Sequence, residues 1–532
     1  MNVNVIVQQL NILFIDSVED VNNLDSMVRD NIISSLKQIA LEAQTNSEFR
    51  KELGLNQQFW IITNNMQTWV LKNLFNDEYF IFPVTLWLLR VFKNIVAAIT
   101  ENQNKALEQE WNKFIEQILW HFFLKYRQEN DNTEFNISIL RSGTQALSNM
   151  ITGNTFTQEC VWVDFMNRNE SNDLLSTLAR YGDNGTLTSC LVLVHNCIFE
   201  SDTRRALVCS GSGNRLLKFL LDKTETLLED ENFELIYTIV SRLIDFDLFP
   251  TLYDSLNTYS KQIPTHNQII LLKLLDSKLH STINISNSFS FHSCTFLLKL
   301  FNSLCPQVIN LMKQLEIENS TSETNVSLED DVPQEIEENR LLFSGLVLLL
   351  QCFVSLSQDG NNKICECLFK EGIVSTVIFL LIQADKTLPR VTKAISSSIT
   401  QNLQNGITGF SHIKREIIKI IGNMSYENKI VQEEVRKMGG IPLILNQCNI
   451  DDNNPCNYAI LALRNLLIDN LDNQKLIKEL ETIGTVQNDI LKQAGIKTEL
   501  DKDDTCSKNW FYNTVSVEPD KAMVTRTIKD HS

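Results

Sequence analysis

The chain has 532 residues, of which 43% are hydrophobic, and its formal net charge is −18. This composition excludes an intrinsically disordered chain, and the scarcity of glycine (17) and proline (9) argues against a β-sandwich or β-barrel, which need many turns. An acidic surface repels phosphate backbones and anionic lipids, so we expect no nucleic-acid partner.

The N-terminal stretch indicates no secretory signal peptide. It has no basic n-region, and Asp16 and Glu19 come early. The twelve cysteines follow no disulfide framework and include no Cys-x-x-Cys pair, as is typical of reduced cysteines. We therefore expect a cytoplasmic protein.

A spaced pattern recurs along the chain: an asparagine, a second asparagine five residues later and a glutamine nine residues after the first. It is complete in "NMITGNTFTQ" from Asn149, "NMSYENKIVQ" from Asn423 and "NLLIDNLDNQ" from Asn465. A copy from Asn94 has isoleucine in the middle, and a weaker one keeps only Asn196. Such internal repetition predicts a repeat protein.

The spacing of the copies identifies the repeat type. Asn423 and Asn465 are 42 residues apart, Asn149 and Asn196 are 47 apart, and Asn94 and Asn149 are 55 apart. Armadillo and HEAT units have periods of about 40–47 residues. The sequence predicts an all-α, armadillo/HEAT-like α-solenoid of stacked helical repeats with acidic loop insertions.

Between Asn196 and Asn423 no clean copy occurs, but four apolar runs have helical length and spacing and indicate degenerate repeats. The runs are 216–221, 233–244, 269–275 and 296–304. We assign residues 1–315 to N-terminal helical repeats.

The following segments divide the rest of the chain. Residues 316–340 carry nine acidic residues against one arginine and predict a flexible acidic loop or linker. The apolar stretch 341–357 is short for a membrane span and predicts a buried helix. It opens the C-terminal repeats, 341–500, which contain a predicted loop insertion at about 385–412. Residues 501–532 predict a loosely held tail.

The leading asparagines lie on the side of their helices opposite the apolar stripe, which predicts a polar ladder along the stack. The candidate partner-binding residues are Asn94, Asn149, Asn196, Lys419, Asn423, Leu461 and Asn465. Side-chain amides carry a donor and an acceptor, so such a row could bind the backbone of an extended peptide. Alternatively, each asparagine could bind the neighbouring repeat and lock the stack. The sequence leaves both open.

No residues form a recognisable catalytic, cofactor or metal site. The "SGSGNRLL" stretch has Leu216 where a dinucleotide fingerprint needs a third glycine, so it predicts a turn between helices. Cys190, His195 and Cys197 do not share a helix face, as metal ligands would have to. We expect no catalytic residues, no cofactor and no metal.

The C-terminal third resembles a known family. The string "GFSHIKREIIKIIGNMSYENKIVQEEVRKMGGIPLILNQCNIDDNNP" and the following "AILALRNLLIDNLDNQKLI" are similar to the C-terminal domain of the ataxin-10 family, from about 409 to 499. The resemblance implies an armadillo-like adaptor without enzymatic activity, connected with neurite growth, neuronal survival, cytokinesis and the cilium base. It implies a cytoplasmic location (perinuclear, midbody or cilium base). It also implies as partners the O-GlcNAc transferase, a G-protein β subunit and possible self-association.

Other armadillo adaptors offer alternative functions. Nuclear-import adaptors place tryptophan four residues before each groove asparagine, where this chain has Arg90, Gln145, Lys419 and Leu461. A signalling scaffold of the β-catenin kind would need a basic groove, which an acidic chain does not obviously provide. An enzyme with an unrecognised site is a remote third reading. The sequence favours a non-catalytic scaffold that binds proteins and does not span a membrane.

Overall fold

The computed structural model describes most of the chain. The described residues are 2–15, 26–74, 78–128, 134–227, 230–257, 263–282, 289–321, 334–358, 363–387, 410–448, 456–479, 496–497 and 516–517. They form two compact units, Met1–Leu466 and Leu467–Ser532.

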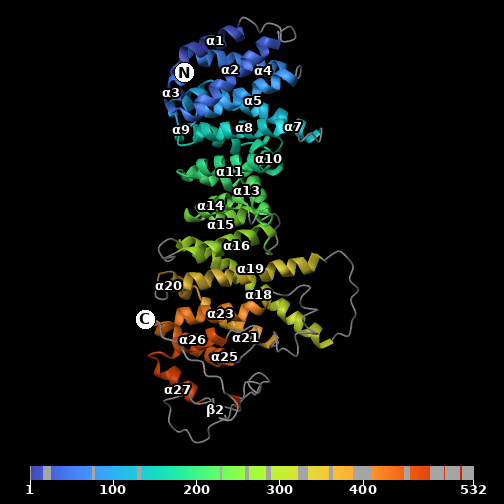
Figure 1. The fold of residues 1–532 in the computed structure, drawn as a ribbon. Coiled ribbons are helices and arrows are strands. Elements are labelled where there is room, and N and C mark those ends of the chain that lie inside the picture. Colours follow the sequence, from blue (N-terminus) through green and yellow to red (C-terminus); the bar gives the residue numbers. More distant parts are fainter. Residues whose placement is uncertain are drawn as a thin grey trace. The chain divides into compact units, whose positions relative to one another are not determined.

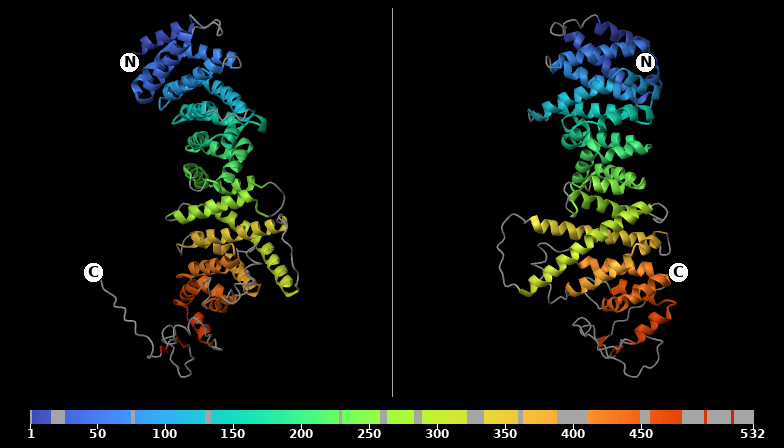
Figure 2. Two further views of the ribbon diagram at one scale, coloured as in Figure 1. Left: turned by 45° about the vertical axis from the view of Figure 1, so that its right-hand side comes forward. Right: turned by 180° about the vertical axis from the view of Figure 1, so that it is seen from behind.

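The first unit is a stack of helices, as the repeat pattern predicts (Figure 1). One helix of each repeat packs on its counterpart in the next, and we call these the ladder helices. They are α2 (Ser26–Thr45), α5 (Glu78–Ile95), α8 (Glu134–Ile151), α11 (Asn184–Ile198), α14 (Glu231–Asp245), α16 (His266–Ser281), α19 (Gln334–Ser357), α23 (Phe410–Ser425) and α26 (Cys456–Leu467). Figure 2 shows the same order from two further sides.

The other helices of this unit connect the ladder helices and cover them. They are α1 (Val3–Ile15), α3 (Ser47–Leu55), α4 (Gln57–Asn73), α6 (Thr100–Glu108), α7 (Trp111–Gln128), α9 (Thr155–Met166), α10 (Leu174–Tyr181), α12 (Asp202–Ala206), α13 (Gly211–Thr224), α15 (Phe249–Ser255), α18 (Phe291–Thr321), α20 (Lys363–Lys370), α21 (Ile373–Thr387), α24 (Lys429–Lys437) and α25 (Gly440–Asn446), with short 3₁₀ helices η2 (Glu170–Asn172) and η3 (Leu207–Cys209). Groups such as α6–α7–α8, α9–α10–α11 and α24–α25–α26 each contain a short helix, a second helix and a ladder helix. This three-helix unit makes the fold an armadillo-type α-solenoid.

The core lies between the helix rows and follows the predicted stripes. Ile417, Ile420 and Ile421 of α23 are fully buried, and so are Ala459 and Ala462 of α26. A helix buries one apolar face in this way because residues three or four positions apart lie on the same side. Most of the stability of each repeat therefore comes from packing on its neighbours.

The degenerate middle of the chain continues the stack. Its four apolar runs lie in α13, α14, α16 and α18, which confirms that they are helical. Ladder helix α14 packs on α11 and on α16, and α16 packs on α19, so the row of repeats is not interrupted.

The turns within the repeats use left-handed backbone at fixed places. Ala98, Gly153 and Glu427 have positive φ, and each directly precedes the residue that caps the next short helix. Gly439, with φ of 72°, is itself the N-cap residue of α25. Without a Cβ, it adopts left-handed backbone without strain.

The predicted segment boundaries differ from the helix ends. Helix α18 runs to Thr321 and α19 begins at Gln334, so both enter the segment 316–340, and residues 322–333 lie outside the described residues. In the predicted insertion, α21 ends at Thr387 and α23 begins at Phe410. Residues 388–409, between these two helices, lie outside the described residues.

The stretch Ile336–Ser357 has the length and composition of a membrane-crossing helix, but 72% of its most apolar 18-residue window is buried inside the chain. It packs on α16, α18 and α23. The stretch thus behaves as the core helix that the sequence predicts.

The second unit contains α27 (Leu471–Glu479) and two short strands, β1 (Ile496–Lys497) and β2 (Ser516–Val517). The strands pair antiparallel, with Ile496 opposite Val517. Apart from β2, residues 501–532, the predicted tail, lie outside the described residues.

Candidate functional site

The predicted asparagine ladder lies along the ladder helices, and its amides bind the preceding repeat. Asn149 Nδ2 donates to the Lys93 carbonyl oxygen at 3.0 Å, and Asn465 Nδ2 donates to that of Gly422 at 2.9 Å. The other three donate in the same direction: Asn94 to Ala40 O (2.8 Å), Asn196 to Thr152 Oγ1 (2.9 Å), and Asn423 to Val354 O (3.2 Å) and Ser357 Oγ (3.3 Å). These bonds perform the stacking role that the sequence left open.

Stacking uses only part of each amide. An asparagine side chain offers two N–H donors and an oxygen acceptor. Four of the five use one donor, and Asn423 bonds two acceptors. Within the described residues, no hydrogen bond is made to the Oδ1 atoms of the five ladder asparagines. A role in binding an extended peptide therefore remains a prediction, compatible with the stacking bonds.

The ladder also continues through the middle repeats with different residues. Arg242 Nη2 of α14 donates to the Phe199 carbonyl at 3.2 Å, just after α11. Lys278 Nζ of α16 lies 2.7 Å from Asp245 Oδ1 at the end of α14. Each donates to the repeat before it, as the asparagines do. The asparagine pattern did not identify Arg242 or Lys278, because the residue type differs although each lies on a ladder helix and donates to the preceding repeat.

The second asparagine of the pattern is the N-cap of the next short helix. Asn154 Oδ1 accepts from the backbone N–H groups of Phe156 and Thr157 at the start of α9. Asn428 Oδ1 accepts from Val431 N in the same way. Capping satisfies N–H groups that lack a partner in the first helical turn, which explains the fixed spacing.

Two glutamines of the pattern, Gln103 and Gln432, link their repeat to the following one. Gln103 Nε2 donates to the carbonyls of Asn149 (2.8 Å) and Thr152 (3.0 Å), and Gln432 Nε2 donates to the carbonyl of Asn465 at 2.9 Å. Both glutamines are almost fully buried. At these two places, neighbouring repeats are joined from both sides, by an asparagine that donates to the preceding repeat and a glutamine that donates to the following one.

The weak copy at Asn196 is a complete unit with substituted residues. Ser201 caps α12 by accepting from Arg204 N, in the place of the second asparagine. Arg205 is nine residues after Asn196, in the glutamine position, and its Nη1 donates to the carbonyls of Ile198 and Phe199. A search for capping residues and long donors at these offsets could have found this unit.

Lys419 and Leu461, each four residues before a ladder asparagine, lie in different environments. Lys419 Nζ is 3.1 Å from Glu416 Oε2 and 4.7 Å from the centre of the Tyr458 ring, so its charge is already engaged. Leu461 is 51% exposed and Tyr458 is 40% exposed. The final ladder helix of this unit thus presents apolar side chains to solvent.

The Cys190, His195 and Cys197 grouping has the properties of helix packing. Both thiols are buried, and burial raises the pKa of Cys190 to about 12 and that of Cys197 still further. A thiol with a raised pKa is a poor nucleophile and a poor metal ligand at neutral pH. Among the described residues, no three His, Cys, Asp or Glu side chains are placed to hold a metal ion.

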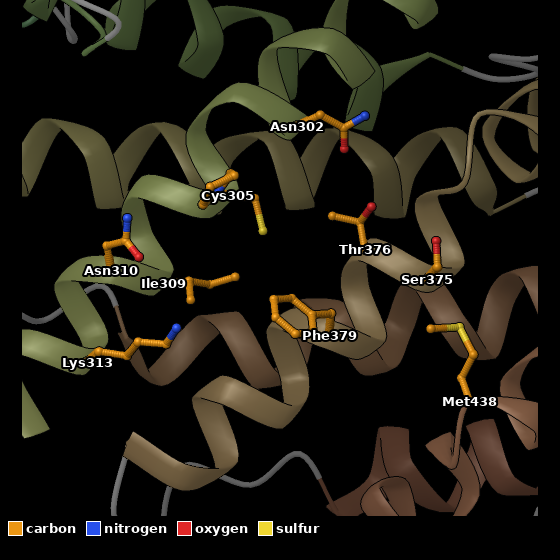
Figure 3. A pocket seen from close by; sticks show the side chains of 10 residues that line it. Asn302, Cys305, Ile309, Asn310, Lys313, Ser375, Thr376, Phe379 and Met438 are labelled. Atoms are coloured by element: carbon orange, nitrogen blue, oxygen red, sulfur yellow. The ribbon is translucent and has the colours of Figure 1, made fainter.

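A cleft of about 570 Å³ lies between α18 and α21 (Figure 3). Cys305 and Ile309 from α18 face Phe379 and Thr376 from α21, and Phe379 is 50% exposed. The residues lining it include no carboxylate and no imidazole, so the cleft has neither of the usual groups for acid–base chemistry.

The chain is similar to known proteins over much of its length. Residues 413–508 match the model of the Spinocerebellar ataxia type 10 protein domain. The chain is 26% identical over 468 residues to an ataxin-10 homolog of Dictyostelium discoideum, covering 68% of this chain and 75% of that protein. It is also 26% identical over 368 residues to ataxin-10 of Xenopus tropicalis, covering 68% of each. Among solved structures, an engineered protein is similar at 13% identity with a TM-score of 0.36, covering 53% of this chain and 91% of that one.

The domain match spans the segment whose residues resemble the family, and the relatives extend the similarity over two thirds of the chain. The chain therefore carries a C-terminal domain of the ataxin-10 type and is similar to ataxin-10 proteins over two thirds of its length.

Proposed function

We propose that the chain is a non-catalytic scaffold that binds segments of partner proteins along the face formed by its ladder helices. The observation that carries the proposal is the ladder itself. Consecutive ladder helices pack on one another through the first unit, so their outward side chains form one continuous surface. An elongated surface of this kind suits an extended segment better than a small molecule.

The chemistry of the ladder supports a peptide partner. Each of the five asparagines keeps its side-chain oxygen, and all but Asn423, whose nitrogen bonds two acceptors, also keep a second N–H; a peptide backbone can pair with both groups. Next to the last asparagine, Leu461 and Tyr458 offer exposed apolar area. Interfaces gain most of their affinity from such apolar and aromatic anchors.

The absence of enzymatic activity and a cytoplasmic location are parts of the same proposal. The cleft lining and the raised thiol pKa values support a non-catalytic role. Location is tested by fluorescence microscopy of a tagged full chain, with nuclear or secreted signal counting against it. The family-implied partners and cellular roles remain expectations for this chain.

The proposal is tested with one exposed position on the ladder face and one away from it. Leu461→Asp changes α26, while Ile430→Asp changes the 69% exposed Ile430 of α24, which is not a ladder helix. Because both side chains are largely exposed, each variant should keep the melting temperature to within about 2 °C. Full-length wild type and both variants are used to capture proteins from cell extract.

We expect partners that the wild type and Ile430→Asp both capture and Leu461→Asp loses. An identical set of captured proteins for all three chains would show that partners do not use this face. A wild-type chain that captures nothing reproducibly would overturn the scaffold function itself.

A further inference from the structure

Two cations from neighbouring ladder helices lie over one tryptophan near the N-terminal end of the first unit, and a third lies one helical turn away. The guanidinium carbon of Arg90 lies 4.6 Å from the centre of the Trp87 ring, and Lys37 Nζ from α2 lies 5.8 Å from it. One turn further along α5, Lys93 Nζ donates to Gln145 Oε1 of α8 at 3.0 Å. We call Lys37, Trp87, Arg90 and Lys93 the basic patch.

The basic patch has no negative partner among the residues that the structure describes. Within the described part of the chain, no carboxylate forms an ion pair with Lys37, Arg90 or Lys93. Several other cations of the first unit are paired: Arg141 with Asp183, Arg168 with Glu116 and Asp164, Arg215 with Asp173, and Lys278 with Asp245. The basic patch is thus a local concentration of positive charge in a chain with 65 acidic and 47 basic residues.

The surroundings of these cations are unfavourable for positive charge. Burial lowers the pKa of Arg90. Burial, and then the charge of Arg90, lower the pKa of Lys93. Both side chains are half-buried. An anion placed between them would relieve this mutual repulsion, since a nearby opposite charge stabilises the charged form of each group.

We propose that the basic patch is a docking surface for an acidic peptide segment of a partner protein, with carboxylates held by Arg90 and Lys93. The inference rests on the proposed scaffold function and names the kind of segment that the N-terminal part of the ladder takes. Asn94 follows Lys93 directly on the ladder, so its free oxygen lies beside the patch to accept a backbone N–H.

The net charge of the chain decides between a peptide and a nucleic acid. A nucleic acid brings a long row of phosphates, which a protein of net charge −18 repels outside the patch. A short run of Asp or Glu, in contrast, is small enough for its charges to lie at the three cations and not along the rest of the acidic surface. A patch of this size suits such a segment.

The test measures binding of a fluorescein-labelled ten-residue Glu-rich peptide to the full-length chain by fluorescence anisotropy. Arg90→Glu with Lys93→Glu reverses both charges. The matched control, Lys51→Glu with Lys72→Glu, makes the same change in net charge at exposed positions on α3 and α4. Circular dichroism checks folding, and Arg90→Gln with Lys93→Gln replaces the reversal variant if that chain is unfolded.

We expect the reversal to weaken binding at least about tenfold and the control to change it less than about threefold. Binding should also weaken as salt is raised from about 50 to 300 mM, because the contact is between exposed charges. A wild-type chain that does not bind the peptide, or equal binding by the reversal and control variants, overturns the proposal.

Two further measurements separate the possible failures. Tighter binding of a fluorescein-labelled single-stranded RNA than of the peptide would overturn the choice of partner class. If the reversal variant still captures every partner that the wild type captures, the basic patch does not bind partners. The scaffold function would remain supported in that case.

Discussion

Replacing Gln103 by methionine tests whether the hydrogen bonds between repeats hold the stack together. Gln103 is 1% exposed, and its Nε2 donates to two carbonyls at the end of α8, those of Asn149 and Thr152. Methionine has nearly the same length and fills the same space but donates no hydrogen bond. The change therefore removes the contact without opening a cavity.

The expected loss follows from the two carbonyls left without this donor. Each lost hydrogen bond to a buried group costs about 1–2 kcal/mol, so the pair costs about 2–4 kcal/mol. Burying a methionine instead of an amide returns about 1 kcal/mol. We expect a net loss of about 2 kcal/mol at the interface between the α5–α6 repeat and α8.

The assay is hydrogen exchange read by mass spectrometry, because solenoid repeats can open locally and a single unfolding transition is not assured. A loss of about 2 kcal/mol speeds exchange through local opening about 30-fold. The faster exchange should be confined to α6, α8 and α9, with α23 unchanged. The exposed Gln58→Met on α4 is the control. Unchanged protection in α8, or equal change in α23, would refute the reasoning.

Three further changes probe other contacts. Asn196→Ala should cost less than about 0.5 kcal/mol in urea unfolding, because the exposed Thr152 hydroxyl that it binds can turn to water; a cost as large as that of Asn149→Ala would contradict this. Arg204→Met should cost about 2–4 kcal/mol in the same assay, since the 1% exposed guanidinium donates to the Cys197 carbonyl and to Gln158; an unchanged urea midpoint would refute it. Asp183→Asn should destabilise the chain at pH 7 and lose most of that effect near pH 3, and an equal effect at both pH values would disprove the assignment.

The pH prediction rests on the surroundings of Asp183. Burial raises the pKa of Asp183, but hydrogen bonds from Arg141, Thr186 and the Gly185 N–H together lower it by more. The net pKa therefore lies below the ordinary 3.8. A carboxyl with a lowered folded pKa contributes stability above the unfolded value, and this stability is lost as the pH falls through the folded value. Asparagine does not titrate, so the two chains converge in acid.

The repeat architecture could be predicted because its signals are local. Asn149, Asn154 and Gln158 recur at fixed offsets since one caps a helix and the others reach neighbouring repeats. The substituted units could not be found by residue type, because Arg242 and Lys278 supply the same donation from different side chains. The sequence also cannot predict which group an asparagine amide binds, since the amide can pair equally well with a partner peptide and with a carbonyl of the neighbouring repeat.

The basic patch escaped prediction for a different reason. Net charge averages over the whole chain, whereas Lys37 and Arg90 are brought to one ring from helices 53 residues apart in sequence. Only the contact between α2 and α5 joins them. An acidic chain can thus carry a local cationic surface that its composition hides.

The change of ladder donors in the middle of the stack affects its elasticity. An asparagine side chain is short, so its amide reaches a carbonyl of the neighbouring ladder helix only when the two helices are one particular distance apart. Such a hydrogen bond resists changes in that distance. Arg242 and Lys278 have long, flexible stems that keep contact while the spacing varies. The Lys278–Asp245 joint is also ionic, and added salt weakens it. We therefore expect the first unit to bend most easily between α11 and α16, and to bend there more easily at high salt.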